Sequence, residues 1–331
     1  MTPPATRTPD GRVPSVLVTG ATGYLGSLTL AALAERRAEL GGLVGVDVRA
    51  PASVPAGVTW RTASVTDSAL GEWLRAGRID TVVHLASILK PPRDGGDALA
   101  YQVDVEGTRN VLAACASAGV RKLILTTSGA AYGYYPDNPA WITEDAPIRG
   151  NPEIAYAFHK RLIEADLARH RRRHPELAQL VFRPGTVIGP GVSTPVTALF
   201  EAPVVLGVLG SESPFVMIWD ADVVACLVRG IFGGATGTYN LAGDGALPPR
   251  EIARRLRKPY VPVPAAALRA TLAALQRLGR SAYGPEHVDF LRYRPVLSNR
   301  ALKERFGYAP RKTSREAFEL WASAREGRPT P

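Results

Sequence analysis

Three glycines at a fixed spacing follow a short apolar run near the start of the chain. Residues 16–18 (VLV) lead into Gly20, Gly23 and Gly26 within the segment SVLVTGATGYLG. Where a strand turns into a helix, such glycines allow a tight turn, a close approach of the backbone to a pyrophosphate, and close packing of the helix on the sheet. The amides that begin the helix predicted over residues 27–37 would face the phosphates. The spacing predicts a dinucleotide site, although an isolated triplet can also be an ordinary strand-to-helix turn.

An acidic residue at the right distance supports the nucleotide site. Residues 43–48 (LVGVDV) have the apolar pattern of a second buried strand, and Asp47 lies near its end. It follows Gly26 by about 20 residues, which is where an acidic side chain accepts hydrogen bonds from the adenosine ribose. Together the two segments predict the beginning of a Rossmann unit.

Further strands and helices alternate along the chain. The apolar patterns predict strands over residues 58–62, 81–87, 122–127, 180–183 and 237–242, and helices over residues 66–76, 98–118, 155–173 and 221–232. We therefore predict the α/β class, with a Rossmann doubly wound parallel sheet and a smaller C-terminal substrate-binding lobe. The expected division is a disordered tail over residues 1–12, an NAD-binding Rossmann domain over 13–190 and a substrate-binding lobe over 191–331, from which residues 221–243 return to the Rossmann domain.

Composition argues against several other kinds of protein. The 331 residues are 46% hydrophobic and 21% charged, which is ordinary for a globular protein. Cys115 and Cys226 lie within apolar helical patterns and are expected in the core, so neither a metal site nor a disulfide is predicted. The net charge of +10 comes mostly from dispersed arginines, and the one dense run, RHRRRH at 169–174, is expected to end a helix. No nucleic-acid partner is therefore predicted.

The sequence pattern also indicates where the protein works. No apolar stretch reaches about 18 residues, and the first 12 residues have too little hydrophobic length for a signal peptide. We therefore expect a cytoplasmic protein without a membrane segment.

A tyrosine and a lysine one helical turn apart mark the candidate active site. Tyr156 and Lys160 share a face of the helix predicted over 155–173, because residues four apart lie one above the other. Ser128 leaves the strand at 122–127 at the carboxyl edge of the sheet, where ligands bind in open α/β folds. A phenol has an ordinary pKa of about 10, so a tyrosine acts as an acid or base near neutral pH only beside a cation. The lysine is placed to supply that cation.

The order of these motifs resembles the extended short-chain dehydrogenase/reductase family, also called the NAD-dependent epimerase/dehydratase family. The resemblance begins with TGATGYLG, whose spacing is GxxGxxG, and continues through Asp47, the HLAS segment at 84–87, Ser128 and the Tyr156/Lys160 pair. It implies that the tyrosine exchanges a proton with a substrate oxygen, that the lysine also bonds the nicotinamide ribose, and that the serine bonds the oxygen whose charge changes. It also implies NAD as cofactor, a small-molecule substrate, and a homodimer formed by helices near 104–118 and 155–173. The outer apolar positions of that contact would include Leu162, Ile163 and Leu167.

The same resemblance implies a set of cofactor contacts. Ser64 and Val65 stand where the family has an aspartate and an apolar residue beside the adenine, and Asp104 stands where an asparagine is usual. His84, within a buried strand, is expected to be structural. The expected NAD contacts are Gly20, Gly23, Tyr24, Leu25, Gly26, Asp47, Ser64, Val65, Leu85, Ala86, Ser87, Thr127, Tyr156, Lys160, Pro184 and Val187.

Substrate preference is indicated by two departures from the family's nucleotide-sugar branch. Thr186 replaces an asparagine three residues after Arg183, and residues 211–216 (SESPFV) contain no arginine to clamp a pyrophosphate. We therefore expect an oxidoreductase that interconverts a secondary alcohol and a carbonyl on a small hydroxylated substrate. Two alternatives are a nucleotide-sugar epimerase/dehydratase, for which Arg292 and Arg294 could hold an anion, and a non-catalytic NAD-sensing protein. Residues 88–96, which include Lys90 and Arg93, are expected to overhang the site.

NAD is expected instead of NADP because of Asp47. Its carboxylate would repel the 2′-phosphate of NADP. Arg49, two residues on, could neutralise that phosphate, as in NADP-selective enzymes. We expect its guanidinium to point to solvent or stack beside the adenine, because Asp47 holds it away from the ribose.

Overall fold

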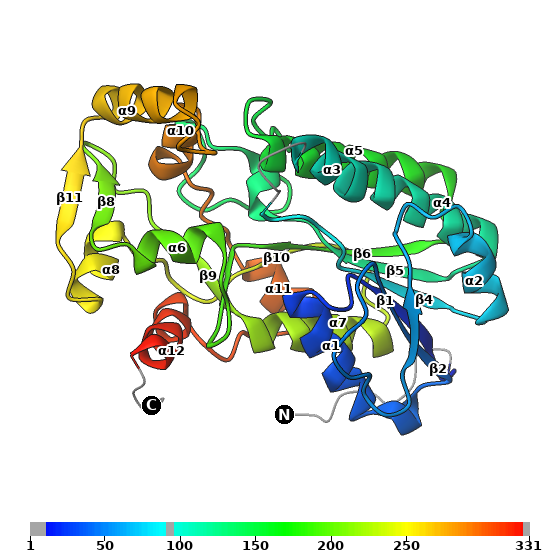
Figure 1. Ribbon diagram of the computed structural model, residues 1–331. Helices are drawn as coiled ribbons and strands as arrows, with labels where there is room; N and C mark the ends of the chain where they lie inside the picture. Colours follow the sequence, from blue (N-terminus) through cyan, green and yellow to red (C-terminus); the bar gives the residue numbers. More distant parts are fainter. Residues whose placement is uncertain (1–10, 91–95, 327–331) are drawn as a thin grey trace.

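A seven-stranded parallel sheet lies at the centre of the computed structural model, which describes residues 11–90 and 96–326 (Figure 1). The strands run in the order β10-β6-β5-β4-β1-β2-β3, and each neighbouring pair is parallel. They are β1 (Ser15–Thr19), β2 (Gly42–Asp47), β3 (Thr59–Thr62), β4 (Thr81–His84), β5 (Lys122–Thr126), β6 (Ala178–Pro184) and β10 (Gly237–Leu241). The chain passes from β1 to β2 and β3 on one side, and then crosses to the other side of β1 to form β4. The point at which the strand order reverses therefore lies between β1 and β4. The predicted fold class is confirmed.

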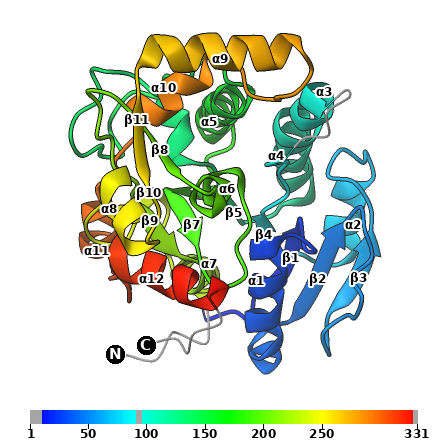
Figure 2. The same ribbon diagram turned by 60° about the vertical axis from the view of Figure 1, so that its left-hand side comes forward.

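Helices cover both faces of this sheet (Figures 1 and 2). On one face α1 (Tyr24–Ala34) packs on α7 (Asp220–Phe232). On the other, α4 (Gly107–Ala118) packs on both α2 (Leu70–Ala76) and α5 (Ala155–Arg173). Alternation along β1 explains the two cores, because Val16 and Val18 join the first cluster while Leu17 joins the second. Cys115 and Cys226 are buried in these cores, as predicted.

The helix predicted over 98–118 consists of three consecutive segments. These are α3 (Gly96–Tyr101), the π-helical turn η2 (Gln102–Glu106) and α4. A π-turn is wider than an α-turn and is often found at functional sites. Here it contains Asp104, whose side chain is buried.

Two helix boundaries differ from the predictions for local reasons. Helix α1 begins at Tyr24, three residues before the predicted start, because Gly23 already serves as its N-cap. Helix α2 begins at Leu70 instead of residue 66. Asp67 caps a preceding turn, in which its Oδ1 accepts a hydrogen bond from the Ala69 amide at 2.9 Å. Helix α5 has its predicted bounds, and its last turn holds the basic run, as expected.

The second lobe packs at one end of the sheet (Figures 1 and 2). It contains two parallel strand pairs, β8 (Val205–Val208) with β11 (Tyr260–Val263) and β7 (Thr186–Ile188) with β9 (Met217–Trp219). Its helices are α6 (Pro195–Glu201), α8 (Pro249–Arg255), α9 (Ala265–Arg277), α10 (His287–Arg292) and α12 (Ser314–Arg325). Helix α11 (Arg300–Glu304) packs on β10 of the central sheet instead. Its core is aromatic, with the Phe200 ring edge-on to those of Phe215, Phe318 and Trp321. Neither small sheet was predicted, because strands of three or four residues leave little pattern in a sequence.

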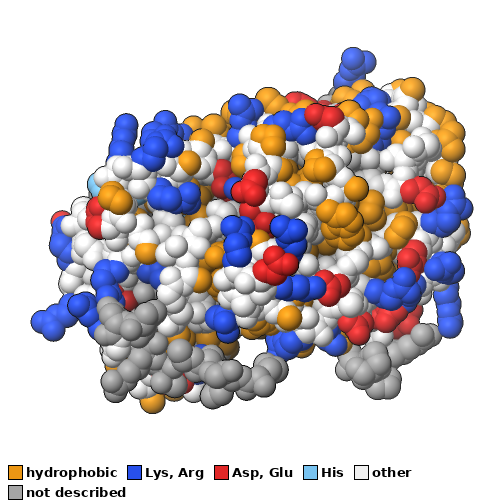
Figure 3. Space-filling view, turned by 180° about the vertical axis from the view of Figure 1, so that it is seen from behind, with side chains coloured by type: hydrophobic (Ala, Val, Ile, Leu, Met, Phe, Trp, Pro, Cys, Tyr) orange, Lys and Arg blue, Asp and Glu red, His pale blue; other side chains and the backbone are white. Residues whose placement is uncertain are grey.

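The surface carries its basic side chains in a dispersed arrangement. On the face opposite to that of Figure 1, blue Lys and Arg groups are scattered with Asp and Glu groups between them (Figure 3). Within residues 11–90 and 96–326, no helix is both long and apolar enough to span a membrane. The predicted tail lies mainly in residues 1–10, outside the described residues.

Candidate active site

The glycine turn after β1 brings backbone segments too close together for any side chain. Gly20 has a φ of +66°, and a Cβ there would lie 2.5 Å from the Ala86 nitrogen. A Cβ on Gly26 would lie 2.1 Å from the Gly20 oxygen. Both distances are far below a van der Waals contact, so only glycine fits at either position. The turn therefore places the start of α1 at the carboxyl ends of β1 and β4, where its unpaired amides suit a dinucleotide phosphate.

Asp47 lies at the end of β2, facing the glycine turn. Its Oδ2 accepts from the Thr22 amide at 3.0 Å, and its Oδ1 accepts from the Arg49 amide at 3.3 Å. A cavity of about 350 Å³ opens here, lined by residues that include Thr22, Arg49, Ser53 and Trp60. Thr22 was not among the predicted cofactor residues, and it positions the carboxylate that would meet the ribose.

Arg49 is arranged differently from the expectation. Its guanidinium is exposed, as predicted, but Nη2 lies 3.5 Å from Thr22 Oγ1, on the side of the glycine turn. Asp47 contacts the backbone amide of Arg49 instead of its guanidinium. The guanidinium thus lies on the side of the glycine turn, and its position relative to the ribose stays a prediction.

The turn after β3 is fixed by an asparagine that sequence reasoning missed. Asn110 Nδ2 donates to the carbonyls of Val65 at 2.8 Å and Asp67 at 2.9 Å. Ser64 Oγ accepts from the Thr66 amide at 3.1 Å. Val65 is buried against Gly107, which leaves little of its side chain to contact an adenine ring. The signal for this role was the asparagine within VEGTRNV.

His84 is structural, as predicted. Its Nδ1 lies 2.7 Å from Thr19 Oγ1, and its Nε2 lies 3.1 Å from Thr108 Oγ1. Thr108 donates its own proton to the Asp104 carbonyl at 2.5 Å, so its hydroxyl accepts from Nε2–H. Burial, with a smaller contribution from Lys160, lowers the pKa of His84 to about 4. The ring is therefore neutral at pH 7 and ties β1, β4 and α4 together.

The structure brings Tyr156, Lys160 and Ser87 into one group. Lys160 is 3% exposed, and its Nζ donates to Ser87 Oγ at 2.9 Å. The same Nζ lies 5.1 Å from the centre of the Tyr156 ring, one turn earlier on α5. Ser128 follows β5 as the N-cap of η3 (Gly129–Tyr132), where its Oγ accepts from the Ala130 amide at 3.1 Å. All four residues lie on segments that begin or end at the carboxyl edge of the sheet.

Asp104 is the nearest acidic group to Lys160. Its Oδ2 lies 3.6 Å from Lys160 Nζ, and its Oδ1 accepts from the Ile88 amide at 2.9 Å. The carboxylate is 1% exposed. The sequence indicated a buried polar residue that bonds the backbone near the active site, with a role in proton relay as the alternative, and the bond to the Ile88 amide agrees with the first interpretation. The ion pair with Lys160 was not predicted.

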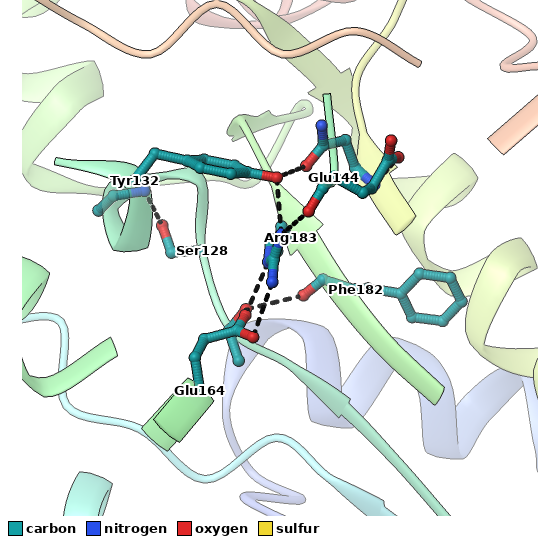
Figure 4. Close-up of polar contacts among 9 residues, drawn as sticks. Ser128, Tyr132, Glu144, Glu164, Phe182 and Arg183 are labelled. Carbon is teal, nitrogen blue, oxygen red and sulfur yellow. Dashed lines mark hydrogen bonds and ion pairs between the residues drawn. The ribbon is translucent and has the colours of Figure 1, made fainter. Parts of the chain in front are cut away.

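A buried network supports the strand end that carries Ser128 (Figure 4). Arg183 on β6 donates to both oxygens of Glu164, at 2.8 and 2.9 Å, and to the Tyr132 hydroxyl at 2.8 Å. Thr127 Oγ1 donates to the same Glu164 at 2.7 Å. Burial raises the pKa of Tyr132 to about 12, so it stays a phenol. Thr127, predicted to touch the cofactor, thus uses its hydroxyl to join β5 to α5.

The other predicted cofactor residues surround the same edge. Leu85 donates its amide to the Thr19 carbonyl at 3.2 Å, so the residues after β4 remain beside β1. Tyr24 donates its hydroxyl to Asp220 Oδ2 at 2.5 Å, which links the glycine turn to α7. Pro184 ends β6, and Val187 lies in β7.

The second lobe places aromatic side chains next to Tyr156. Tyr134 is buried, and its ring lies edge-on to Phe290 with centres 5.3 Å apart. Tyr156, Phe290 and Tyr293 pack on the cluster that contains Tyr134. Lys90 Nζ lies 3.4 Å from Ser193 Oγ, at the loop expected to overhang the site, while Arg93 lies outside the described residues. Across the described ranges, no group of three or more His, Cys, Asp or Glu side chains could hold a metal ion.

Two of the three residues that were expected at the outer apolar positions of the dimer contact are buried inside the subunit. Ile163 and Leu167 are buried in the core between α5 and the sheet, so they do not lie on the outer face. Their positions follow from the helical repeat, because they share the inner face of α5 with Lys160. Leu162 is half-buried. The homodimer stays a prediction.

Comparison with known proteins gives related proteins along most of the chain. Residues 16–205 match the model of the NAD dependent epimerase/dehydratase family. The uncharacterized protein Rv0501 of Mycobacterium tuberculosis is 30% identical over 310 residues, which cover 92% of this chain and 82% of that protein. A 3-diazoavenalumate denitrifying reductase of a Streptomyces species is 29% identical over 241 residues, covering 70% and 77% of the two chains. The UDP-glucose 4-epimerase of Thermus thermophilus, solved with NAD, is 25% identical with a TM-score of 0.72 and covers 95% of this chain and 99% of its own.

Proposed function

This chain belongs to the NAD-dependent epimerase/dehydratase family, and we propose that it interconverts a secondary alcohol and a carbonyl on a small hydroxylated substrate. The observation that carries the proposal is the placement of the buried Lys160 ammonium 5.1 Å from the Tyr156 ring, with Ser128 at the end of the adjoining strand. NAD, when bound, supplies the hydride acceptor or donor. The chain would supply the proton transfer and hold the substrate oxygen.

Each residue has a separate proposed role. Tyr156 would take the proton of a substrate hydroxyl in oxidation, or give its own proton to a carbonyl oxygen in reduction. Lys160 would stabilise the anionic form of the tyrosine, and Ser128 would donate a hydrogen bond to the oxygen whose charge changes. Ser128 Oγ is an acceptor for the Ala130 amide, so its proton remains available for such a bond.

Replacement of Tyr156 by phenylalanine tests this role. Because the change removes the proton donor and almost no contact area, we expect turnover to fall by about 10²–10⁴-fold while the Kd for NAD stays within about twofold. Tyr135→Phe is the matched control, since that ring stacks on Arg149 away from the lysine and should keep full activity. A Tyr156→Phe protein with undiminished turnover would contradict the mechanism. NAD binding without hydride transfer across a broad alcohol and carbonyl panel would favour the NAD-sensing alternative.

A nucleotide-sugar substrate is the second candidate, and Arg294 favours it. This side chain is 7% exposed, and its Nε has no hydrogen-bond partner among the described residues. A buried guanidinium of this kind suits a phosphate or carboxylate of the substrate. Thermal stabilisation by UDP- or dTDP-sugars beyond that given by NAD alone would support this candidate. An equal melting temperature with and without these sugars would leave the small-substrate proposal preferred.

A further inference from the structure

A buried carboxylate, that of Asp104, lies beside Lys160 in the candidate active site. Asp104 is 1% exposed, and its Oδ2 has no hydrogen-bond partner among the described residues, although it lies 3.6 Å from Lys160 Nζ. A buried ion pair rarely stabilises a fold more than an apolar pair of the same size. The π-helical turn η2 nevertheless carries this residue into the site. This arrangement indicates a role in the chemistry.

The other titratable groups near Asp104 do not neutralise it. His84 on β4 is neutral at pH 7, because burial lowers its pKa to about 4. His159 on α5 is also buried, and burial lowers its pKa. The negative charge of Asp97 on α3 acts in the other direction and raises the pKa of His159, but by less than burial lowers it. At neutral pH the positive partner of Asp104 is therefore Lys160.

Few other charges act on Tyr156. Tyr134 faces it from the segment after η3, and burial, followed by the proximity of Tyr156, raises the pKa of Tyr134, which remains a phenol. Arg294 interacts with Tyr134 from the segment after α10. The Lys160 ammonium lies 5.1 Å from the centre of the Tyr156 ring, so the field at that ring depends on how far the Lys160 charge is offset.

We propose that Asp104 is a positioning residue, a fixed counter-ion of Lys160 that offsets part of the field of its ammonium at Tyr156 and so favours the phenol form of that side chain over the tyrosinate. The inference rests on the proposed function. A phenol is the form needed for reduction: a hydride from the reduced cofactor forms the new C–H bond, and the Tyr156 proton passes to the carbonyl oxygen. The products are the alcohol, the oxidised cofactor and a tyrosinate that regains a proton from solvent. Asp104 would accordingly favour carbonyl reduction over alcohol oxidation.

Ionisation of Tyr156 can be followed without a substrate. Tyrosinate absorbs in the near ultraviolet, so the difference between NAD-saturated wild type and NAD-saturated Tyr156→Phe gives the titration of this residue alone. In Asp104→Asn the midpoint should fall by about one unit, because the ammonium of Lys160 is no longer offset. Asparagine Oδ1 still accepts from the Ile88 amide, so the substitution removes charge and little else.

Asp166→Asn is the matched control. It removes a buried carboxylate from α5, the helix that carries Lys160. Asp166 pairs with Arg109, at 2.7 Å, and not with Lys160, so the midpoint should stay unchanged. Asp104→Ser provides a second neutral variant should Asp104→Asn fail to fold.

Two outcomes would overturn the inference. An unchanged midpoint in the Asp104 variants would remove the role of Asp104 and leave the proposed function standing. Undiminished turnover by Tyr156→Phe would remove Tyr156 as the proton-transfer group, and the proposed function with it.

Discussion

Two arginines are buried within residues 11–90 and 96–326, one in each half of the molecule, and they are held in different ways. Arg183, in the sheet beneath the cofactor edge, is 6% exposed and donates to both oxygens of Glu164. Arg294, in the second lobe, is 7% exposed and lies 3.7 Å from the centre of the Phe215 ring. Its guanidinium donates to the carbonyls of Ser213 and Phe290, and its Nε has no partner among the described residues. The first arginine is satisfied within the fold, whereas the second retains capacity for an anion from outside.

Stacking on aromatic rings is common in the second lobe. Arg311 lies 4.6 Å from the centre of the Trp219 ring, and Arg250 lies 4.7 Å from that of Tyr260. Each of these two arginines also pairs with a carboxylate, Arg311 with Asp222 at 2.9 Å and Arg250 with Glu212 at 3.3 Å. Ring contacts occur in the sheet half as well, where Arg183 lies 5.0 Å from the centre of the Tyr132 ring. What distinguishes Arg294 is therefore that it is buried against rings and backbone carbonyls.

Breaking the Arg183 pair should have the largest effect. Arg183→Met leaves the Glu164 carboxylate buried without its partner, so we expect the free energy of unfolding to fall by about 3–5 kcal/mol. Urea unfolding measures this change. The double variant Arg183→Met, Glu164→Leu should recover most of the loss, because neither charge then remains buried alone. A single variant as stable as the wild type would show that the pair is not what holds this half together.

Cofactor selectivity should change less, and it depends on Asp47. We expect the wild type to bind NAD about a hundredfold more tightly than NADP, which corresponds to about 2–3 kcal/mol of repulsion between the carboxylate and the 2′-phosphate. In Asp47→Ala the preference should shrink toward equality, because Arg49 Nη2 lies 3.5 Å from Thr22 Oγ1 and remains close to that phosphate. Isothermal titration with both cofactors measures the ratio. Equal binding by the unmodified protein would show that Arg49 governs the site.

Much of the sheet half could be predicted because its signals are local. The spacing of Gly20, Gly23 and Gly26 reports a turn within seven residues, and the spacing of Tyr156 and Lys160 reports one helical turn. The second lobe could not be predicted in this way. Arg294 stacks on a ring that lies 79 residues earlier (294 − 215), and only tertiary structure brings the two together. The same reason hid the contact between Asp104 and Lys160, because the turn that buries Asp104 is π-helical and the pattern predicted a continuous α-helix.

Replacement of Arg294 should have the smallest effect on stability and is the sharpest test of the comparison. Burial without a carboxylate lowers the pKa of Arg294 to about 9, which is the sign of a cation that the fold disfavours. Arg294→Met removes that unfavourable burial together with the stacking on Phe215, and the two effects oppose each other. We therefore expect the free energy of unfolding to change by no more than about 1 kcal/mol, against about 3–5 kcal/mol for Arg183→Met. Affinity for an anionic substrate should fall in Arg294→Met and change little in Arg183→Met. The reason is that Arg294 Nε has no hydrogen-bond partner in the described part of the chain, whereas Arg183 already donates to Glu164 and Tyr132. If Arg294→Met destabilised the protein as much as Arg183→Met, this arginine would be a structural element like the other, and the case for an anion site in the second lobe would be lost.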